Sequence, residues 1–195
     1  TPTRRQRQMC IRDRIRLELR SFADIGLVGL PNAGKSTFLD AVSSAKPKIG
    51  DYPFTTIKPN LGTIKYFDKS FVFADIPGLI EGASQGTGLG IKFLKHISRT
   101  KALLIFLDPH NTEYDFENQL KILINEMRHF DSKLLQKDIW IVLNKIDTVD
   151  NLDENLSIID KYIPRELKIN QIRGISSISK QGVKELFDEV FKKLT

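Results

Sequence analysis

The segment Gly29-Leu-Pro-Asn-Ala-Gly34-Lys35-Ser36 fits the pattern G-x-x-x-x-G-K-[ST] of a phosphate-binding loop. Its glycines let backbone N–H groups close around phosphate oxygens, and a helix starting here adds the positive end of its dipole. We expect Lys35 to bind the β- and γ-phosphates and the Ser36 hydroxyl to ligate Mg²⁺. The loop residues between the glycines are Leu30, Pro31, Asn32 and Ala33.

A second motif, Asp75-Ile76-Pro77-Gly78, follows a predicted strand. An acid at this place can hold Mg²⁺, directly or through water, which makes Asp75 a candidate metal ligand. The N–H of Gly78 can reach a γ-phosphate and reorient when that phosphate leaves. D-x-x-G is a weak pattern alone, so its position after the phosphate-binding loop carries the prediction.

A third motif, Asn144-Lys145-Ile146-Asp147, closes the apolar run that ends in Leu143. The Asp147 carboxylate only accepts hydrogen bonds. Guanine presents N1–H and an amine side by side, whereas a buried acceptor facing adenine would stay unpaired at a cost of about 1–3 kcal/mol. Asp147 is therefore predicted to select GTP over ATP. Asn144 can bridge base and loop, and the stem of Lys145 can lie along the base.

A fourth motif, Ser176-Ser177-Ile178, follows the last predicted strand. Backbone N–H groups here could donate to O6 of guanine. Serine-rich turns are common in any protein, so this motif is accepted only because it comes after Asp147.

All four motifs follow predicted strands, which alternate with predicted helices. This order predicts an α/β P-loop fold with a mostly parallel six-stranded sheet flanked by helices. Ligands then bind beyond the carboxyl ends of the strands. A glycine-rich loop is expected at 78–90; the strands are expected at 23–29, 61–67, 71–75, 101–108, 138–144 and 169–176, and the helices at 35–44, 91–98, 116–130, 153–162 and 183–194.

Composition excludes several classes of protein. The chain has 195 residues, of which 41% are hydrophobic, and this favours one folded domain. The longest apolar run, 102–107, is far shorter than the roughly 20 residues of a membrane span, and the chain does not open with a secretion leader. The lone Cys10 suits a reducing compartment. We therefore expect a cytoplasmic monomer without a membrane span.

The net charge of +6 is concentrated at one end of the chain. Residues 1–20 carry seven arginines and two acids, which leaves +1 for residues 21–195. We interpret 1–14 as a basic leader, disordered or foreign to the domain, 15–22 as the remnant of a preceding domain or linker, and 23–195 as the GTPase domain. Thr1 is not an initiator, which suggests a fragment.

The order of motifs resembles a translation-factor-type GTPase, and two stretches resemble the Obg family in particular. These are Tyr52-Pro-Phe-Thr-Thr-Ile-Lys-Pro-Asn-Leu-Gly62 and Asp75-Ile-Pro-Gly-Leu-Ile-Glu-Gly-Ala-Ser-Gln-Gly-Thr-Gly-Leu-Gly90. The resemblance covers residues 15–194, and 15–20 resemble the end of the family's glycine-rich N-terminal domain, which is otherwise missing. It implies a cytoplasmic bacterial GTPase that binds the large ribosomal subunit, acts in its assembly and is linked to the stringent-response nucleotide.

The family pattern also assigns roles to residues. It implies that Phe54, Thr55, Thr56, Ile57 and Lys58 form the first switch, where Thr56 meets Mg²⁺ and the γ-phosphate; Thr55 is the competing assignment. The resemblance thus gives Lys35, Thr56 and Gly78 catalytic roles and makes Ser36, Thr56 and Asp75 the metal ligands. Ser177 stands where alanine is common, which should matter little if the contact runs through the backbone.

One catalytic residue of other GTPases is missing. Leu79 occupies the place where glutamine orients water, so intrinsic turnover is expected to be slow, on the order of 10⁻⁴ s⁻¹ or somewhat faster. Asn32 resembles the asparagine that helps bind K⁺ in related GTPases, where the ion supplies positive charge. The alternative is that Asn32 only caps the loop.

Other functions remain as alternatives. A P-loop kinase or an Obg-like ATPase should lack Asp147, and a guanine-nucleotide sensor without hydrolysis would not need the set Lys35, Ser36, Thr56 and Asp75. His96, His110 and His129 lack metal-ligand spacing. Asp108 is interpreted as a turn residue after a strand, although it could support the loops on the base side.

Overall fold

A seven-stranded sheet forms the centre of the computed structural model, which describes residues 23–44, 48–49, 60–75, 100–165 and 167–195. The strand order is β2-β3-β4-β1-β5-β6-β7, and β2 and β3 are antiparallel to their neighbours while the rest are parallel. The predicted six strands are present, and the two-residue β2 adds a seventh at the edge. The strands are β1 (Ile25–Gly29), β2 (Lys48–Ile49), β3 (Asn60–Tyr66), β4 (Lys69–Asp75), β5 (Ala102–Leu107), β6 (Asp138–Leu143) and β7 (Ile169–Gly174).

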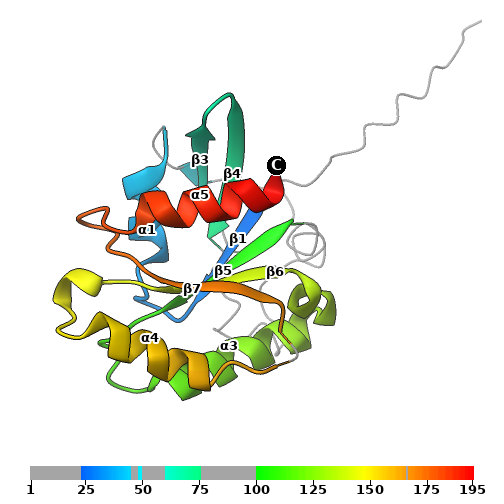
Figure 1. Cartoon of the computed structure of the whole chain (residues 1–195). Helices are drawn as coiled ribbons and strands as arrows, with labels where there is room; N and C mark the ends of the chain where they lie inside the picture. The colour runs from blue at the N-terminus through cyan, green and yellow to red at the C-terminus, as the bar shows by residue number, and fades with distance from the viewer. Residues whose placement is uncertain (1–22, 45–47, 50–59, 76–99, 166) are drawn as a thin grey trace, which may run out of the picture.

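Helices cover both faces of the sheet. The elements α1 (Lys35–Val42) and α5 (Val183–Leu194) lie on one face, and α3 (Phe116–Phe130) and α4 (Leu152–Lys161) on the other (Figure 1). Helices α3 and α5 begin and end at the predicted residues. Two short 3₁₀ segments, η2 (Ser132–Gln136) and η3 (Ile146–Thr148), flank β6. The predicted loop at 78–90 and helix at 91–98 lie outside the described residues, as do 1–22.

The central strands position the site. Every residue of β1 and β5 is buried, because parallel strands covered on both faces are apolar throughout. In the pairing register, Gly29 of β1 lies beside Phe106, and Leu107 of β5 lies beside Leu143 of β6. The three strands therefore end at one edge, where the loops that follow them meet.

A hydrophobic core lies on each side of the sheet. One core packs β1, β5 and β6 against α3 and α4, and the other packs the opposite face against α1 and α5. Phe38 of α1 is fully buried in the second core, its ring centroid 5.2 Å from that of Phe106. Phe71 and Phe73 share one face of β4, and the Phe71 ring stacks on Phe191 of α5 at 4.3 Å.

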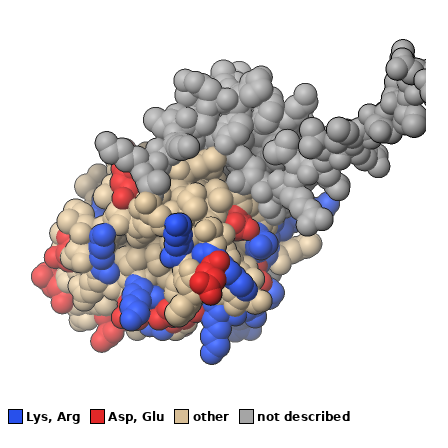
Figure 2. Space-filling view, turned by 90° about the horizontal axis from the view of Figure 1, so that it is seen from above, with Lys and Arg blue, Asp and Glu red and all other residues tan. Residues whose placement is uncertain are grey.

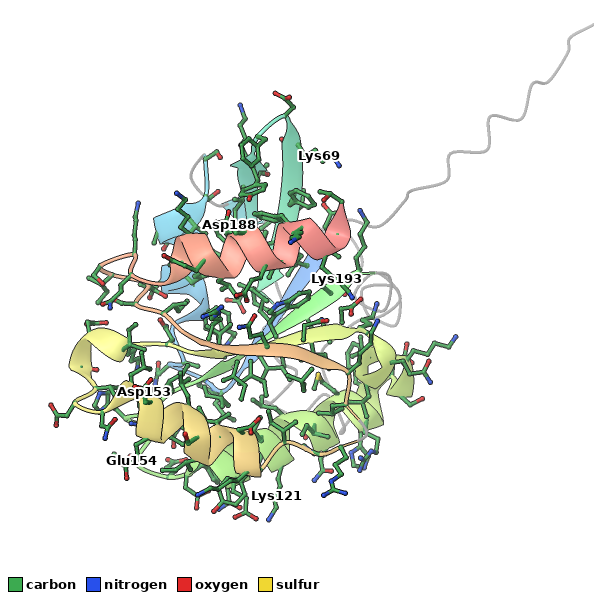
Figure 3. All side chains as sticks on the ribbon, in the orientation of Figure 1. Lys69, Lys121, Asp153, Glu154, Asp188 and Lys193 are labelled. Carbon is green, nitrogen blue, oxygen red and sulfur yellow. The ribbon has the colours of Figure 1, made fainter. Side chains whose placement is uncertain are left out.

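The start of α4 follows local capping rules, whereas the β3–β4 hairpin turn departs from them. Asn151 caps α4 by accepting from the N–H of Glu154 at 3.3 Å, and the acids Asp153 and Glu154 lie in its first turn at the positive end of its dipole (Figure 3). The β3–β4 turn lies at Phe67–Asp68, one residue earlier than predicted, and Phe67 has a φ of 50°.

The described surface carries mixed charge. On the face seen in Figure 2, lysine and arginine side chains alternate with acidic ones and form no area of a single sign. This agrees with the near-neutral balance after residue 20. No helix in the described ranges is long and apolar enough to cross a bilayer.

Candidate nucleotide-binding site

The phosphate-binding loop connects β1 to α1, as the sequence predicts. Gly29 ends the strand and Gly34 caps the helix with φ 87° and ψ 19°, in the left-handed region that favours glycine. A Cβ built on Gly34 would lie 2.2 Å from Nδ2 of Asn144, so a side chain here would collide with the loop after β6, residues 144–147, which we call the base-side loop. The glycine thus permits both the turn and the close approach of the two loops.

Lys35 folds back over this loop. Its Nζ donates to the backbone oxygen of Gly29 at 2.8 Å and to that of Leu30 at 3.0 Å. These two bonds hold the ammonium at the mouth of the loop rather than in solvent. The positive charge therefore lies where the loop would enclose phosphate oxygens.

Ser36 and Asp75 meet at the start of α1 and the end of β4. The Ser36 hydroxyl donates to Oδ2 of Asp75 at 2.7 Å. Asp75 is only 4% exposed, and its Oδ1 is buried without a hydrogen-bond partner in the described part of the chain. A buried carboxylate oxygen of this kind suits a hard cation, because carboxylate and hydroxyl oxygens are the ligands that Mg²⁺ takes. Residues 100–165, like the other described ranges, hold no cluster of three His, Cys, Asp or Glu side chains suited to a metal.

Asn144 joins the phosphate side of the site to the base side. Its Nδ2 donates to the backbone oxygen of Ala33 at 2.9 Å. Its Oδ1 accepts from the N–H of Ser177 at 3.2 Å and from the Ser177 hydroxyl at 2.8 Å. Because Asn144 is 1% exposed, these bonds form away from water. One side chain thus sets the spacing of three loops.

The segment after Asn144 presents Lys145 and Asp147. Lys145 has a φ of 64°, and its Nζ forms an ion pair with Oδ2 of Asp108 at 2.6 Å. Ile146 is buried and donates its N–H to the backbone oxygen of Ile175 at 3.1 Å. Asp147 follows it in η3 and is exposed. The buried Ile146 therefore anchors a turn that leaves the Asp147 carboxylate accessible.

The loop after β7 offers fewer N–H donors than the sequence suggests. The N–H of Ser176 donates to the backbone oxygen of Gln181 at 3.0 Å, and that of Ser177 faces Asn144. The N–H of Ile178 makes no hydrogen bond within the described ranges. A contact from this loop to O6 of guanine stays a prediction.

Comparison with known proteins identifies the family. A profile of the family described as "50S ribosome-binding GTPase" matches residues 24–145. The chain belongs to this GTPase family. It is also 48% identical over 182 residues to GTPase Obg of Chlorobaculum tepidum, an alignment that covers 93% of this chain and 51% of that protein. The chain thus spans about half the length of this relative.

Solved structures show that the fold is the P-loop GTPase G-domain fold. The G domain of the FeoB iron transporter of T. maritima matches with a TM-score of 0.63 and 20% identity, over 88% of this chain and 98% of that one. A GTP-binding protein of Sulfolobus solfataricus in complex with GDP matches with a TM-score of 0.65 and 20% identity, over 88% of this chain and 53% of that one. At this identity the likeness concerns the fold alone.

Two contacts bear on the expectations from the sequence. The Ser177 hydroxyl bonds to Asn144, so the expectation that serine matters little at this place overlooks a buried hydrogen bond. Asp108 accepts from the N–H of His110 in a turn and also pairs with Lys145, which favours the alternative that it supports the loop after β6. The available signal was a polar residue directly after a buried parallel strand.

Several predicted residues lie outside the described ranges. The structure brings together the phosphate-binding loop, Asp75, Asn144–Asp147 and Ser176–Ile178 at one edge of the sheet. The predicted first switch and three residues of the Asp75–Gly78 motif do not belong to the described residues. These are Phe54, Thr55, Thr56, Ile57, Lys58, Ile76, Pro77 and Gly78.

Proposed function

We propose that this domain binds GTP and hydrolyses it slowly, as a switch of the Obg type. The observation that carries the proposal is the pair of links through Asn144, which fasten the phosphate-binding loop to the loop bearing Asp147. A ligand that binds both loops needs phosphates for the phosphate-binding loop at one end and a hydrogen-bond donor for the Asp147 carboxylate at the other. A guanine nucleotide has both, because its N1–H and amine face an acceptor.

The residues present fit Mg²⁺. Ser36 and Asp75 would hold it, together with Thr56 of the first switch, and the buried Oδ1 of Asp75 gives the ion a ligand. When bound, Mg²⁺ neutralises charge on the β- and γ-phosphates. Thr55 remains the alternative to Thr56.

The protein's own groups act by positioning and by charge. Lys35 supplies a fixed positive charge, and the loop N–H groups and the start of α1 add donors that need no reorganisation during reaction. The chain has Leu79 where other GTPases orient water with glutamine, so hydrolysis waits for a further activator. We assign one such role to K⁺, held with the help of Asn32, which is exposed on the loop in a left-handed conformation.

The partner we propose is the large ribosomal subunit. The family's description as 50S ribosome-binding GTPases and the similarity to GTPase Obg support this assignment. The near-neutral charge balance of residues 21–195 gives no strong basic footprint for RNA, so we assign much of the contact to other parts of the protein. A role in subunit assembly, a link to the stringent-response nucleotide and a cytoplasmic location belong to the same proposal.

Nucleotide competition tests the binding step. A fluorescent GDP bound to the protein with Mg²⁺ should be displaced by GTP and by GDP but not by the same concentration of ATP or ADP. Equal displacement by the two purines would refute the proposal and favour an ATPase.

Single-turnover phosphate release tests the chemical step. Release from GTP should be slow in Na⁺, faster in K⁺ and faster again with large ribosomal subunits, and Lys35→Met should abolish it. Equal rates in the two salts would exclude K⁺ as an activator. Absence of phosphate release under all conditions would favour a nucleotide sensor.

A further inference from the structure

Four residues in the loops after β5 and β6 form a closed ring of hydrogen bonds through their side chains and two backbone groups, and we call this ring the clasp. Its members are Asp108 and His110 after β5, and Lys145 and Thr148 after β6. Lys145 Nζ donates to Asp108 Oδ2 at 2.6 Å, and the N–H of His110 donates to Asp108 Oδ1 at 3.0 Å. The Thr148 hydroxyl bonds to the backbone oxygen of Lys145 at 2.7 Å, and His110 Nε2 lies 2.6 Å from that hydroxyl.

Counting protons fixes the direction of the last bond. The Thr148 hydroxyl has one hydrogen, and it donates this hydrogen to the oxygen of Lys145. Towards His110 the hydroxyl can therefore only accept, so His110 must carry its proton on Nε2. A donor at that position, rather than imidazole itself, is what the clasp requires.

The clasp holds a strained residue. Lys145 occupies the left-handed region with φ 64° and ψ 33°, which a residue with a side chain adopts only when its surroundings impose it. Here the side chain is held by Asp108 and the backbone oxygen by Thr148. Lys145 lies between Asn144 and Ile146, so its conformation sets the direction in which the chain reaches Asp147.

The clasp is anchored in the core rather than in the phosphate-binding loop. Asp108 is 4% exposed, and its backbone exchanges two hydrogen bonds with the amide of Gln119 in α3, at 3.0 and 2.9 Å. Leu30, Pro31 and Asn32 of the phosphate-binding loop and the loop after β5 line one cavity of about 460 Å³. The hydrogen bonds to Gln119 and Lys145 tie Asp108 to α3 and to the loop after β6.

We propose that Asp108 and His110 are positioning residues for guanine specificity. They touch no nucleotide themselves but fix Lys145 and, through it, the place of Asp147. This inference rests on the proposed binding of guanine nucleotides. It gives the clasp a measurable role: without it, Asp147 is less well placed to accept from the exocyclic amine of guanine.

The test compares GDP with IDP, whose base lacks that amine. The ratio of their Kd values does not depend on the fraction of protein that is folded, so a merely structural defect leaves it unchanged. Asp108→Asn keeps an acceptor for His110 but removes the charge that faces Lys145, and His110→Leu removes the donor to Thr148. Each should reduce the preference for GDP over IDP about tenfold.

Two further variants sharpen the test. His110→Gln restores an N–H near the position of Nε2 and should recover most of the preference. Asp138→Asn breaks an ion pair with Lys168 at the opposite end of β6 and should leave the preference unchanged. His110 is exposed, so its variants will fold even if Asp108→Asn does not.

The outcomes separate the two proposals. A wild-type protein that prefers GDP, with an unchanged preference in Asp108→Asn and His110→Leu, would overturn the role of the clasp alone. Equal loss in His110→Leu and His110→Gln would also overturn it, because the donor would then be irrelevant. A wild type without preference for GDP over ADP would instead defeat the proposed function.

Discussion

Replacing Ser177 by alanine should measurably lower the unfolding free energy of the nucleotide-free protein. The Ser177 hydroxyl donates to Oδ1 of Asn144 at 2.8 Å, and Ser177 is only 4% exposed. The same oxygen also accepts from the N–H of Ser177, so the variant leaves no buried acceptor unpaired. The loss is thus that of one ordinary buried hydrogen bond, about 1 kcal/mol of unfolding free energy.

Asn144→Ala provides the contrast. It removes three hydrogen bonds and leaves the backbone oxygen of Ala33 and the N–H and hydroxyl of Ser177 without that partner. Unpaired buried polar groups cost more than a lost bond, so we expect a loss of about 3–5 kcal/mol. The double variant should lose no more than Asn144→Ala alone, because the Ser177 hydroxyl already lacks its acceptor there.

Urea unfolding of the nucleotide-free protein measures these differences. Trp140 in β6 is 2% exposed and is the only tryptophan of the chain, so its fluorescence reports on the core. At this size, a loss of 1 kcal/mol corresponds to a fall of about 2–4 °C in Tm. The reasoning would be refuted if Ser177→Ala were as stable as the wild type. It would also be refuted if the double variant lost an unfolding free energy equal to the sum of the losses of the two single variants.

Three further predictions concern the metal site, the ion pair of Asp138 with Lys168 and the core. Asp75→Asn should weaken Mg²⁺ binding about 10–100-fold, measured by following nucleotide release as the Mg²⁺ concentration is varied. Mg²⁺ binding by the variant as tight as that of the wild type would contradict this. Burial raises the pKa of Asp138, but bonds from Lys168 and Asn170 outweigh it and hold that pKa below its usual range. This stabilisation is present above the unfolded pKa of about 3.9 and is lost as pH falls through the lower folded pKa. Asp138→Asn should therefore be less stable than the wild type at pH 7 and equally stable in strong acid. A difference in stability between the two proteins that stays the same at both pH values would contradict this. Phe38→Ala should cost about 3–5 kcal/mol in urea unfolding, because Phe38 is fully buried, and a loss below about 1 kcal/mol would contradict that packing.

The sequence predicts the central strands and the long helices because their patterns are local. The apolar run of β5 and the spacing of α3 each follow from burial on one or two faces. The two-residue β2 could not be predicted, since its strand state depends on pairing with Asn60 and Leu61 of β3. The turn was displaced by one residue because Phe67 adopts a left-handed conformation that polar or glycine residues usually take.

The candidate site also has a part that the sequence predicts and a part that only the fold reveals. Contiguous motifs around Lys35 and Asp147 are visible in the chain itself. The pair Lys145–Asp108 and the bond from Asn144 to Ala33 join residues far apart in the chain, so only the folded sheet brings them together. Asp108 and His110 belong to no motif: the sequence leaves support of the base-side loops open for Asp108, and the contact of His110 with Thr148 requires the folded loops after β5 and β6.

Replacement of Asp147 by asparagine tests the central claim most directly. In the proposed binding mode the carboxylate accepts from the N1–H and amine of guanine, whereas an asparagine amide can donate to the oxygen that xanthine carries at C2. The Kd values of GDP and XDP should therefore exchange rank: the wild type prefers GDP, and Asp147→Asn prefers XDP. If Asp147→Asn binds GDP as tightly as the wild type and ignores XDP, the base is not recognised by this side chain and the account is wrong.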